Sequence, residues 1–224
     1  MFLYFIIGCC FGSFLCLVAQ RVPQDLSIIS PRSHCVNCQQ TLRWYELIPL
    51  FSIVIQRFRC RSCQARLSTI YLLAELTSGA LFMYAGAYLT DTVHLIWLAI
   101  AFLFSLMDIF HLAIDTRVFY FSWTFLWVYW LLTAQFQVGT SFVFSVISFG
   151  LLRYGQAYLG AGDTLLLLSW SGGLTSSQLI MLLFIASCLG ISYFGLTALL
   201  HKKRKQLPFI PFLSIALWLI LHFR

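Results

Sequence analysis

The chain has 224 residues, of which 61% are hydrophobic and only 9% are charged. A soluble domain of this size carries far more Lys, Glu and Asp, so the composition excludes a soluble globular protein and indicates an all-α polytopic membrane protein. The net charge of +7 then reflects the retention of Lys and Arg on the cytoplasmic side of a membrane. It does not indicate nucleic-acid binding, and we expect no nucleic-acid partner.

Apolar runs that approach the roughly 20 residues needed to cross a bilayer predict about eight transmembrane segments. In chain order they cover residues 2–19, 69–90, 93–111, 118–134, 140–156, 163–174, 178–200 and 209–223. The sixth segment is short and contains Gly172 and Gly173, which favours a half-helix or a re-entrant piece. The first segment has no basic n-region, and Gly8 and Gly12 suit helix packing better than a processing site, so we expect a retained helix.

Four cysteines in the polar stretch of residues 20–68 form two C-x-x-C motifs, Cys35 with Cys38 and Cys60 with Cys63. Two such pairs about 20 residues apart suit a tetrahedral Zn²⁺ ion. Disulfides are disfavoured in a reducing compartment, and unpaired or redox-active cysteines are the remaining alternative. Four thiolates leave no open coordination position, so the predicted metal is structural and supplies folding energy to a small cytoplasmic loop domain.

Basic residues predict the orientation in the membrane. If residues 20–68 lie in the cytoplasm and the chain crosses the membrane eight times, nearly every Lys and Arg falls on the cytoplasmic side. These residues are Arg21, Arg32, Arg43, Arg57, Arg59, Arg61, Arg66, Arg117, Arg153 and the run Lys202–Lys205, and only Arg224 falls outside. We interpret the run Lys202–Lys205 as a topogenic anchor near anionic membrane lipid.

Two aspartates lie at the ends of apolar runs, Asp108 at the end of the third predicted segment and Asp163 in the sequence Gly160-Ala-Gly-Asp163. A carboxylate in a membrane segment is costly, so it needs a partner, water or a chemical role. The orientation above places both at the cytoplasmic boundary, where we expect them to meet and to do acid–base chemistry. Asp115 is a rival for the first position, because it shares a helical face with Asp108 if that helix continues. We prefer Asp108 and interpret Asp115, beside Arg117, as an exposed loop charge. Glu75, inside the second segment, also needs a partner, and an arginine of the loop is our candidate.

The chain carries an ordered set of motifs along nearly its full length. They are Gly8-Cys-Cys-Phe-Gly12-Ser13, Arg21-Val-Pro23, Ser33-His-Cys35-Val-Asn-Cys38, Trp44-Tyr-Glu46-Leu-Ile-Pro49, Arg59-Cys60-Arg-Ser-Cys63, Tyr71-Leu-Leu-Ala-Glu75-Leu, the Asp108 segment, Gly160-Ala-Gly-Asp163 and Pro208-Phe-Ile-Pro211. This set resembles the bacterial type IV prepilin peptidases, including the competence-type enzymes of Gram-positive bacteria. The chain departs from the family pattern at Cys16, where Asn is frequent, at Asp115-Thr116, where Pro-Asp is frequent, and at Leu165, where Lys is frequent.

The resemblance implies a multi-pass enzyme of the bacterial cell membrane. Such enzymes cleave the basic leader from prepilins or pseudopilins of type IV pili, competence or type II secretion systems, on the cytoplasmic side. Many then N-methylate the new amino terminus with S-adenosylmethionine. The catalytic aspartates of the family match Asp108 and Asp163, and Gly160 and Gly162 belong to the supporting catalytic loop. The implied domains are a first helix at 1–19, a zinc-binding loop associated with methyl transfer at 20–68, and a transmembrane aspartic peptidase core at 69–224.

Two other classes of function are compatible with intramembrane aspartates and a zinc loop. An ion- or proton-coupled transporter predicts a polar path that continues across the bilayer, whereas both aspartates are predicted at one face. An assembly scaffold that docks through the zinc loop gives the G-A-G-D sequence no purpose. The sequence therefore favours the peptidase.

Overall fold

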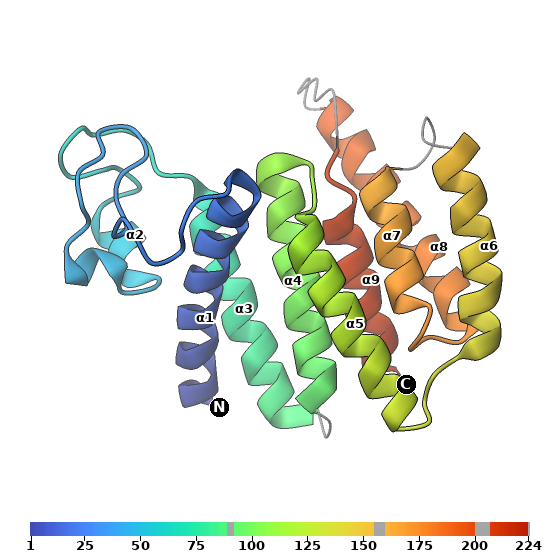
Figure 1. Cartoon of the computed structure of the whole chain (residues 1–224). Coiled ribbons are helices and arrows are strands. Elements are labelled where there is room, and N and C mark those ends of the chain that lie inside the picture. Colours follow the sequence, from blue (N-terminus) through green and yellow to red (C-terminus); the bar gives the residue numbers. More distant parts are fainter. Residues whose placement is uncertain (89–91, 155–159, 200–206, 224) are drawn as a thin grey trace. The chain divides into compact units, whose positions relative to one another are not determined.

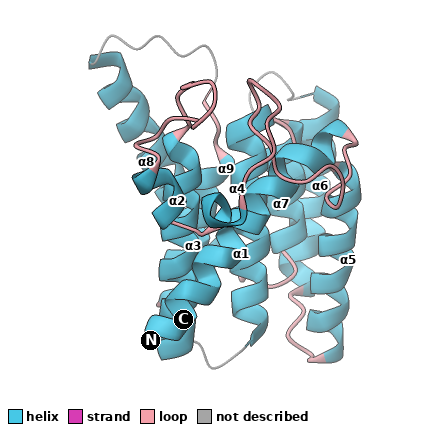
Figure 2. Cartoon of the chain, turned by 90° about the vertical axis from the view of Figure 1, so that its left-hand side faces the viewer, coloured by secondary structure: helices cyan, strands magenta, loops and turns pink. Residues whose placement is uncertain are grey.

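The computed structural model describes residues 1–88, 92–154, 160–199 and 207–223. In these residues the chain forms helices joined by loops and turns, with two isolated β-bridges and no strand (Figures 1 and 2). In chain order the elements are α1 (Phe2–Arg21), η1 (Val22–Gln24), η2 (Trp44–Leu47), α2 (Phe51–Ile55), α3 (Thr69–Tyr88), α4 (Thr92–His111), α5 (Thr116–Leu132), α6 (Val138–Tyr154), α7 (Ala161–Trp170), α8 (Ser176–Leu199) and α9 (Ile210–His222). The prediction of an all-α protein is confirmed.

Each predicted transmembrane segment corresponds to a helix. Among the described residues, four helices are long and apolar enough to cross a membrane: α1 continued by η1, α3, α4 and α8. Helices α6 and α9 contain shorter apolar stretches, Val138–Gly150 and Ile210–His222. The sixth predicted segment is a short helix, α7, as its two glycines indicated. The run Lys202–Lys205, interpreted as an anchor, lies outside the described residues.

The chain divides into two compact units, Met1–Leu106 and Met107–Arg224. In the first unit, α1 and α3 pack side by side through small residues (Figure 1). A Cβ atom built on Gly8 would lie 2.6 Å from the carbonyl oxygen of Ser78, and one on Gly12 would lie 2.6 Å from the Ser78 Cβ. Gly79 is similarly close to the Cys9 sulfur. Small residues let helix backbones approach closely in a membrane, which confirms the predicted packing role of Gly8 and Gly12.

In the second unit, α7 packs against α5 and α6, and α8 packs against α9. The turn after α7 is shaped by tryptophans of α5. The indole N–H of Trp127 donates to the carbonyl oxygen of Ser169 at 2.9 Å, and a Cβ atom on Gly173 would lie 2.3 Å from the ring of Trp130. No glycine among the described residues has a left-handed φ, so Gly173 is needed for space and not for backbone freedom.

Candidate active site and metal centre

Asp108 lies in the last turn of α4 and is buried, with 7% of its surface exposed. Its Oδ2 atom accepts a hydrogen bond from the backbone N–H of Ile210 at 3.0 Å, and the N–H of Phe209 also bonds to the carboxylate. Ile210 is the first residue of α9, where N–H groups are free and the helix dipole is positive. Burial disfavours the charged form of Asp108, and the N–H groups at the start of α9 offset part of that cost.

Asp163 lies in the first turn of α7, whose N-cap is Gly160. The carboxylate folds back over the cap, because a Cβ atom on Gly160 would lie only 3.0 Å from its Oδ2 atom. Gly162 faces the side chain of Ile114, which would lie 3.2 Å from an added Cβ. Asp163 therefore sits inside a helix and not on a turn before it, and the two glycines provide room and not unusual backbone angles.

The structure brings Asp108 and Asp163 together, although they belong to α4 and α7. The negative charge of Asp108 acts directly on the carboxyl group of Asp163. Both residues belong to the unit Met107–Arg224. Two neighbouring carboxylates cannot both ionise cheaply, so a pair of this kind is suited to hold one shared proton.

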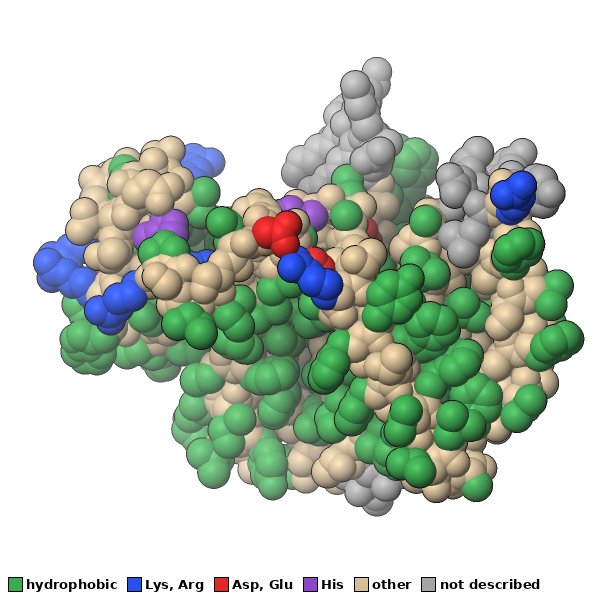
Figure 3. Space-filling model, viewed as in Figure 1, with side chains coloured by type: hydrophobic (Ala, Val, Ile, Leu, Met, Phe, Trp, Pro, Cys, Tyr) green, Lys and Arg blue, Asp and Glu red, His purple; other side chains and the backbone are tan. Residues whose placement is uncertain are grey.

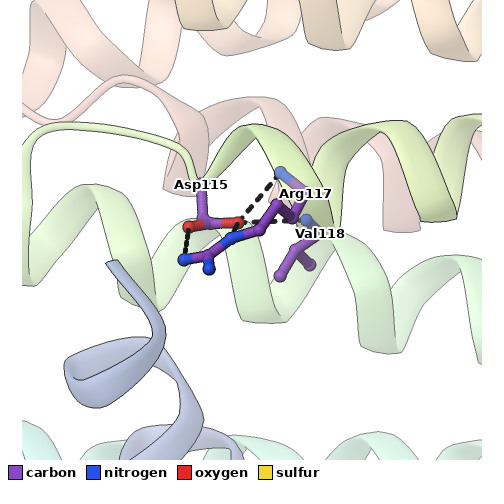
Figure 4. A network of polar contacts seen from close by, with 3 residues as sticks. All are labelled: Asp115, Arg117 and Val118. Atoms are coloured by element: carbon purple, nitrogen blue, oxygen red, sulfur yellow. Dashed lines mark hydrogen bonds and ion pairs between the residues drawn. The ribbon is translucent and has the colours of Figure 1, made fainter. Parts of the chain in front are cut away.

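Asp115 has a different role, shown in Figure 4. It is the N-cap of α5, and its Oδ1 atom accepts hydrogen bonds from the backbone N–H groups of Arg117 at 2.9 Å and Val118 at 3.1 Å. Its Oδ2 atom pairs with the Arg117 guanidinium at 3.0 Å. Burial acts to raise the pKa of Asp115, but these hydrogen bonds outweigh it and lower the pKa below its usual value.

The geometry does not support Asp115 as a rival to Asp108. Helix α4 ends at His111, and Leu112 has a φ of 52°, so the two aspartates do not share one continuous helical face. The interpretation of Asp115 as an exposed loop charge is also wrong. Only 8% of its side chain is exposed, whereas 64% of the Arg117 side chain is.

The four cysteines of the two C-x-x-C motifs converge in the first unit, with their Sγ atoms all within 4.8 Å of one another. The Sγ atoms of Cys35 and Cys63 are 3.8 Å apart, and those of Cys38 and Cys60 are 3.9 Å apart. Four thiolates at about 2.3 Å from a tetrahedral Zn²⁺ ion are separated by about 3.8 Å. The two measured separations match this value, so the residues fit a zinc ion, and a closed set of four thiolates suits a structural metal.

The two motifs are built in the same way. Cys35 N donates to Gln40 O at 3.0 Å and Cys60 N donates to Ala65 O at 2.8 Å, each across an isolated bridge. Backbone N–H groups also point at the sulfurs: that of Cys38 lowers the pKa of the Cys35 thiol, and that of Ala65 is the main cause that lowers the pKa of Cys63 to about 6. Such N–H groups stabilise thiolates, which are the form that binds a metal.

Glu75 is buried in α3 and has partners other than the predicted arginine. Its Oε2 atom accepts a hydrogen bond from the backbone N–H of Leu50 at 2.7 Å, and the hydroxyl of Ser13 in α1 also bonds to it. The arginine prediction is wrong because a backbone donor from the loop satisfies this carboxylate. A backbone donor leaves no mark in the sequence, so no motif could have identified it.

Comparison with known proteins identifies relatives that match most of the chain. A prepilin leader peptidase/N-methyltransferase of Bacillus subtilis (strain 168) is 31% identical over 225 residues, covering 92% of this chain and 88% of the relative. The chain belongs to the prepilin leader peptidase/N-methyltransferase family.

Other family members match in the same regions. A type 4 prepilin-like proteins leader peptide-processing enzyme of Escherichia coli O78:H11 is 33% identical over 247 residues, covering 93% of this chain and 88% of the relative. A member from Myxococcus xanthus is 51% identical over 78 residues, which are 35% of this chain and 23% of that protein. The profile described as Bacterial Peptidase A24 N-terminal domain matches residues 6–89. No solved structure matches the chain significantly.

Proposed function

We propose that this chain is an aspartic endopeptidase of the bacterial cell membrane that cleaves the basic leader from prepilins or pseudopilins on the cytoplasmic side. We further propose that it N-methylates the new amino terminus with S-adenosylmethionine. The observation that carries the peptidase is the meeting of Asp108 and Asp163 at one end of their helices. The names of its relatives supply the substrate class.

The environments of the two carboxylates give them different roles. Asp108 receives backbone N–H bonds from the start of α9, which favours its ionised form, so the shared proton resides on Asp163. The Asp108 carboxylate takes a proton from a water molecule, whose oxygen then forms a bond to the scissile carbonyl carbon. Asp163 donates a hydrogen bond to the carbonyl oxygen, and the C–N bond breaks as the leaving amine takes up a proton from the pair.

The proposed cytoplasmic placement follows from the charges near these helix ends. Arg117 lies in the first turn of α5 and Arg153 in the last turn of α6, so both lie at the same end of the second unit as the start of α7, which carries Asp163 (Figure 1). Basic residues are retained in the cytoplasm. The basic leader of a prepilin is held on that side by the same rule, while its apolar helix enters the membrane.

The zinc ion and the methyl donor have separate parts. Cys35, Cys38, Cys60 and Cys63 would hold Zn²⁺, which stabilises the fold of the loop domain. S-adenosylmethionine would act as a co-substrate. Its methyl group would pass from sulfur to the nitrogen of the amine that cleavage has released, S-adenosylhomocysteine would leave, and the amine would lose one proton to water. Because the closed metal site has no free position, the metal takes no direct part in cleavage.

The decisive experiment is cleavage of a leader-bearing prepilin by purified protein in detergent. Asp108→Asn and Asp163→Asn should each lower the rate at least about 10²-fold, because neither amide can cycle a proton. The wild-type rate should be bell-shaped in pH, with two limbs that belong to the coupled pair. Near-normal cleavage by either variant would refute the pair as assigned.

The transporter alternative is less favoured by the positions of the two aspartates. Asp108 lies in the last turn of α4 and Asp163 in the first turn of α7, so both occur at helix ends that meet. A proton path needs ionisable groups along the depth of the bilayer. Uptake assays on vesicles that contain the protein would distinguish a transporter from the peptidase.

A further inference from the structure

A continuous apolar surface lies on the loop domain, on residues 44–55. Its exposed side chains are Trp44, Leu47, Ile48, Phe51, Val54 and Ile55. In contrast, Glu46 and Ser52 of the same stretch are buried. Figure 3 shows hydrophobic side chains gathered along the lower edge of this domain. An apolar surface of this kind marks an interaction site.

One hydrogen bond fixes the depth of this surface relative to α3. The N–H of Leu50, which precedes α2, donates to Glu75, and Glu75 lies six residues after the first residue of α3. This is roughly 9 Å along the helix axis. With its 20 residues, α3 is about 30 Å long, which matches the hydrocarbon thickness of a bilayer. Helix α2 therefore lies at the depth of the bilayer edge and not above it.

The surroundings of α2 agree with this depth. On α3, Leu73 and Leu76 flank Glu75 and are exposed, so the apolar surface of the transmembrane helix continues at this level. In Figure 1, α2 lies in the lower part of the loop domain. The surface on residues 44–55 thus lies near the level of exposed apolar residues of α3.

The backbone of this stretch suits an environment without water. Phe51 N donates to Pro49 O at 2.7 Å, Ser52 N to Ile48 O at 3.0 Å, Val54 N to Leu50 O at 3.4 Å and Gln56 N to Ser52 O at 3.0 Å. Pro49 has no N–H group, and that of Leu50 is taken by Glu75. Backbone groups must be satisfied in this way where no water can reach them.

Charged residues border the apolar surface at both ends. Arg43 comes directly before Trp44, and Arg57 follows shortly after Ile55, and both arginines are exposed. An apolar face with a basic border is typical of segments that lie in the interface of an anionic membrane, typically about 5–10 Å deep. This charge pattern favours lipid over a second copy of this basic chain.

We propose that residues 44–55 are an interfacial segment that rests in the anionic leaflet of the membrane that α1 and α3 cross. The segment holds the four-cysteine domain against the bilayer and fixes its orientation. This inference does not depend on the peptidase activity. It rests on the geometry of α2 and on the membrane position of α3.

Two matched tryptophan reporters test the proposal in full-length protein. In a Trp44→Phe background, Val36→Trp and Ile55→Trp replace two branched side chains of nearly equal exposure, 77% and 74%. Each protein is placed in lipid nanodiscs of phosphatidylcholine and phosphatidylglycerol, with or without bromine on the acyl chains. Subtraction of the Trp44→Phe spectrum isolates each reporter. Because both side chains are exposed, neither substitution removes packing contacts, and thermal unfolding confirms that each variant is folded.

We expect brominated lipid to quench the Ile55→Trp reporter at least about twofold more than the Val36→Trp reporter, because only the former lies in the acyl-chain boundary. Aqueous acrylamide should show the opposite preference. In nanodiscs of phosphatidylcholine alone, lipid quenching of Ile55→Trp should fall, and an unchanged value would refute the role of the anionic leaflet. Equal access of acrylamide to both reporters would overturn the proposal. Shielding of Ile55→Trp without lipid quenching would overturn it too, since a protein surface would then cover the segment.

Discussion

The carboxylates of Asp108 and Asp163 are positioned by different kinds of neighbour. The donor to Asp108 is a backbone N–H that lies 102 positions further along the chain. A backbone donor does not depend on the side chain of Ile210, so another apolar residue there would still supply it. At Asp163 the decisive neighbour is Gly160, where any Cβ would crowd the carboxylate. The pair is therefore arranged by backbone as much as by side chains.

At Asp115 we predict a capping effect on stability and little effect on cleavage. Asp115→Ala should lower the free energy of unfolding by about 1 kcal/mol, because the N-cap is lost. Asp115→Asn should cost less, because Asn also caps helices and the exposed Arg117 makes a weak ion pair. Thermal unfolding and the prepilin cleavage assay measure the two effects.

The pH dependence of this effect has a defined sign. The folded pKa of Asp115 lies below its usual value, so its advantage over Asn is present above the unfolded pKa of about 3.9. It is lost as the pH falls through the lower folded value. A stability difference between wild type and Asp115→Asn that grows on acidification would contradict the observed hydrogen bonds. An inactive Asp115→Asn enzyme would transfer the first catalytic role to Asp115.

Among the structural elements, the two cysteine motifs predict one Zn²⁺ per chain. Metal analysis of purified protein should give about one equivalent, and Cys→Ser changes in either pair should remove it. Cys10→Ser and Cys188→Ser are matched controls, since both cysteines are exposed and lie outside the cluster. Loss of the metal should impair methyl transfer and loop stability more than peptide cleavage. Freshly purified, reduced protein without metal would refute the site.

A second prediction about a structural element concerns the turn after α7. Gly173→Ala should destabilise the second unit by about 1–3 kcal/mol, because its methyl group collides with the Trp130 ring. Gly195→Ala in α8 is the control: no atom lies within 4 Å of its added Cβ, and Ala favours a helix. Thermal unfolding in detergent should show a lower midpoint for the first variant only. Equal midpoints would mean that α5 and α7 do not pack as described.

The sequence predicted those features whose residues repeat regularly or stand at a fixed spacing. Apolar runs located α1 and the helices from α3 to α9, and the C-x-x-C spacing identified the cysteines that converge. The short helices η1, η2 and α2 were not predicted. The cap at Asp115 was also readable, since Asp before the start of a helix is a common N-cap, but it was interpreted as an exposed charge. The partners of Asp108 and Glu75 were not readable, because both accept from backbone N–H groups of distant residues.

For the whole molecule, the prediction concerns its orientation in the membrane. A cytoplasm-active reporter fused after Lys205 should be active, and a reporter that works only outside the membrane should be active when inserted near Gln137, between α5 and α6. Both aspartates would then be reached from the cytoplasm, where an uncleaved leader lies. The converse pattern would place the pair on the outer face, and the peptidase proposal would fail.

The contact between Asp108 and the start of α9 also has a consequence for the order in which the proposed site is assembled during synthesis. A ribosome completes α4 and α7, with both aspartates, well before it reaches Ile210. Until α9 emerges and folds, Asp108 lacks the donors that favour its charge. Under the proposed mechanism, the nascent chain therefore holds both carboxylates before α9 supplies the donors to Asp108. Under that mechanism, we expect hydrolysis to begin only after α9 has folded against Asp108.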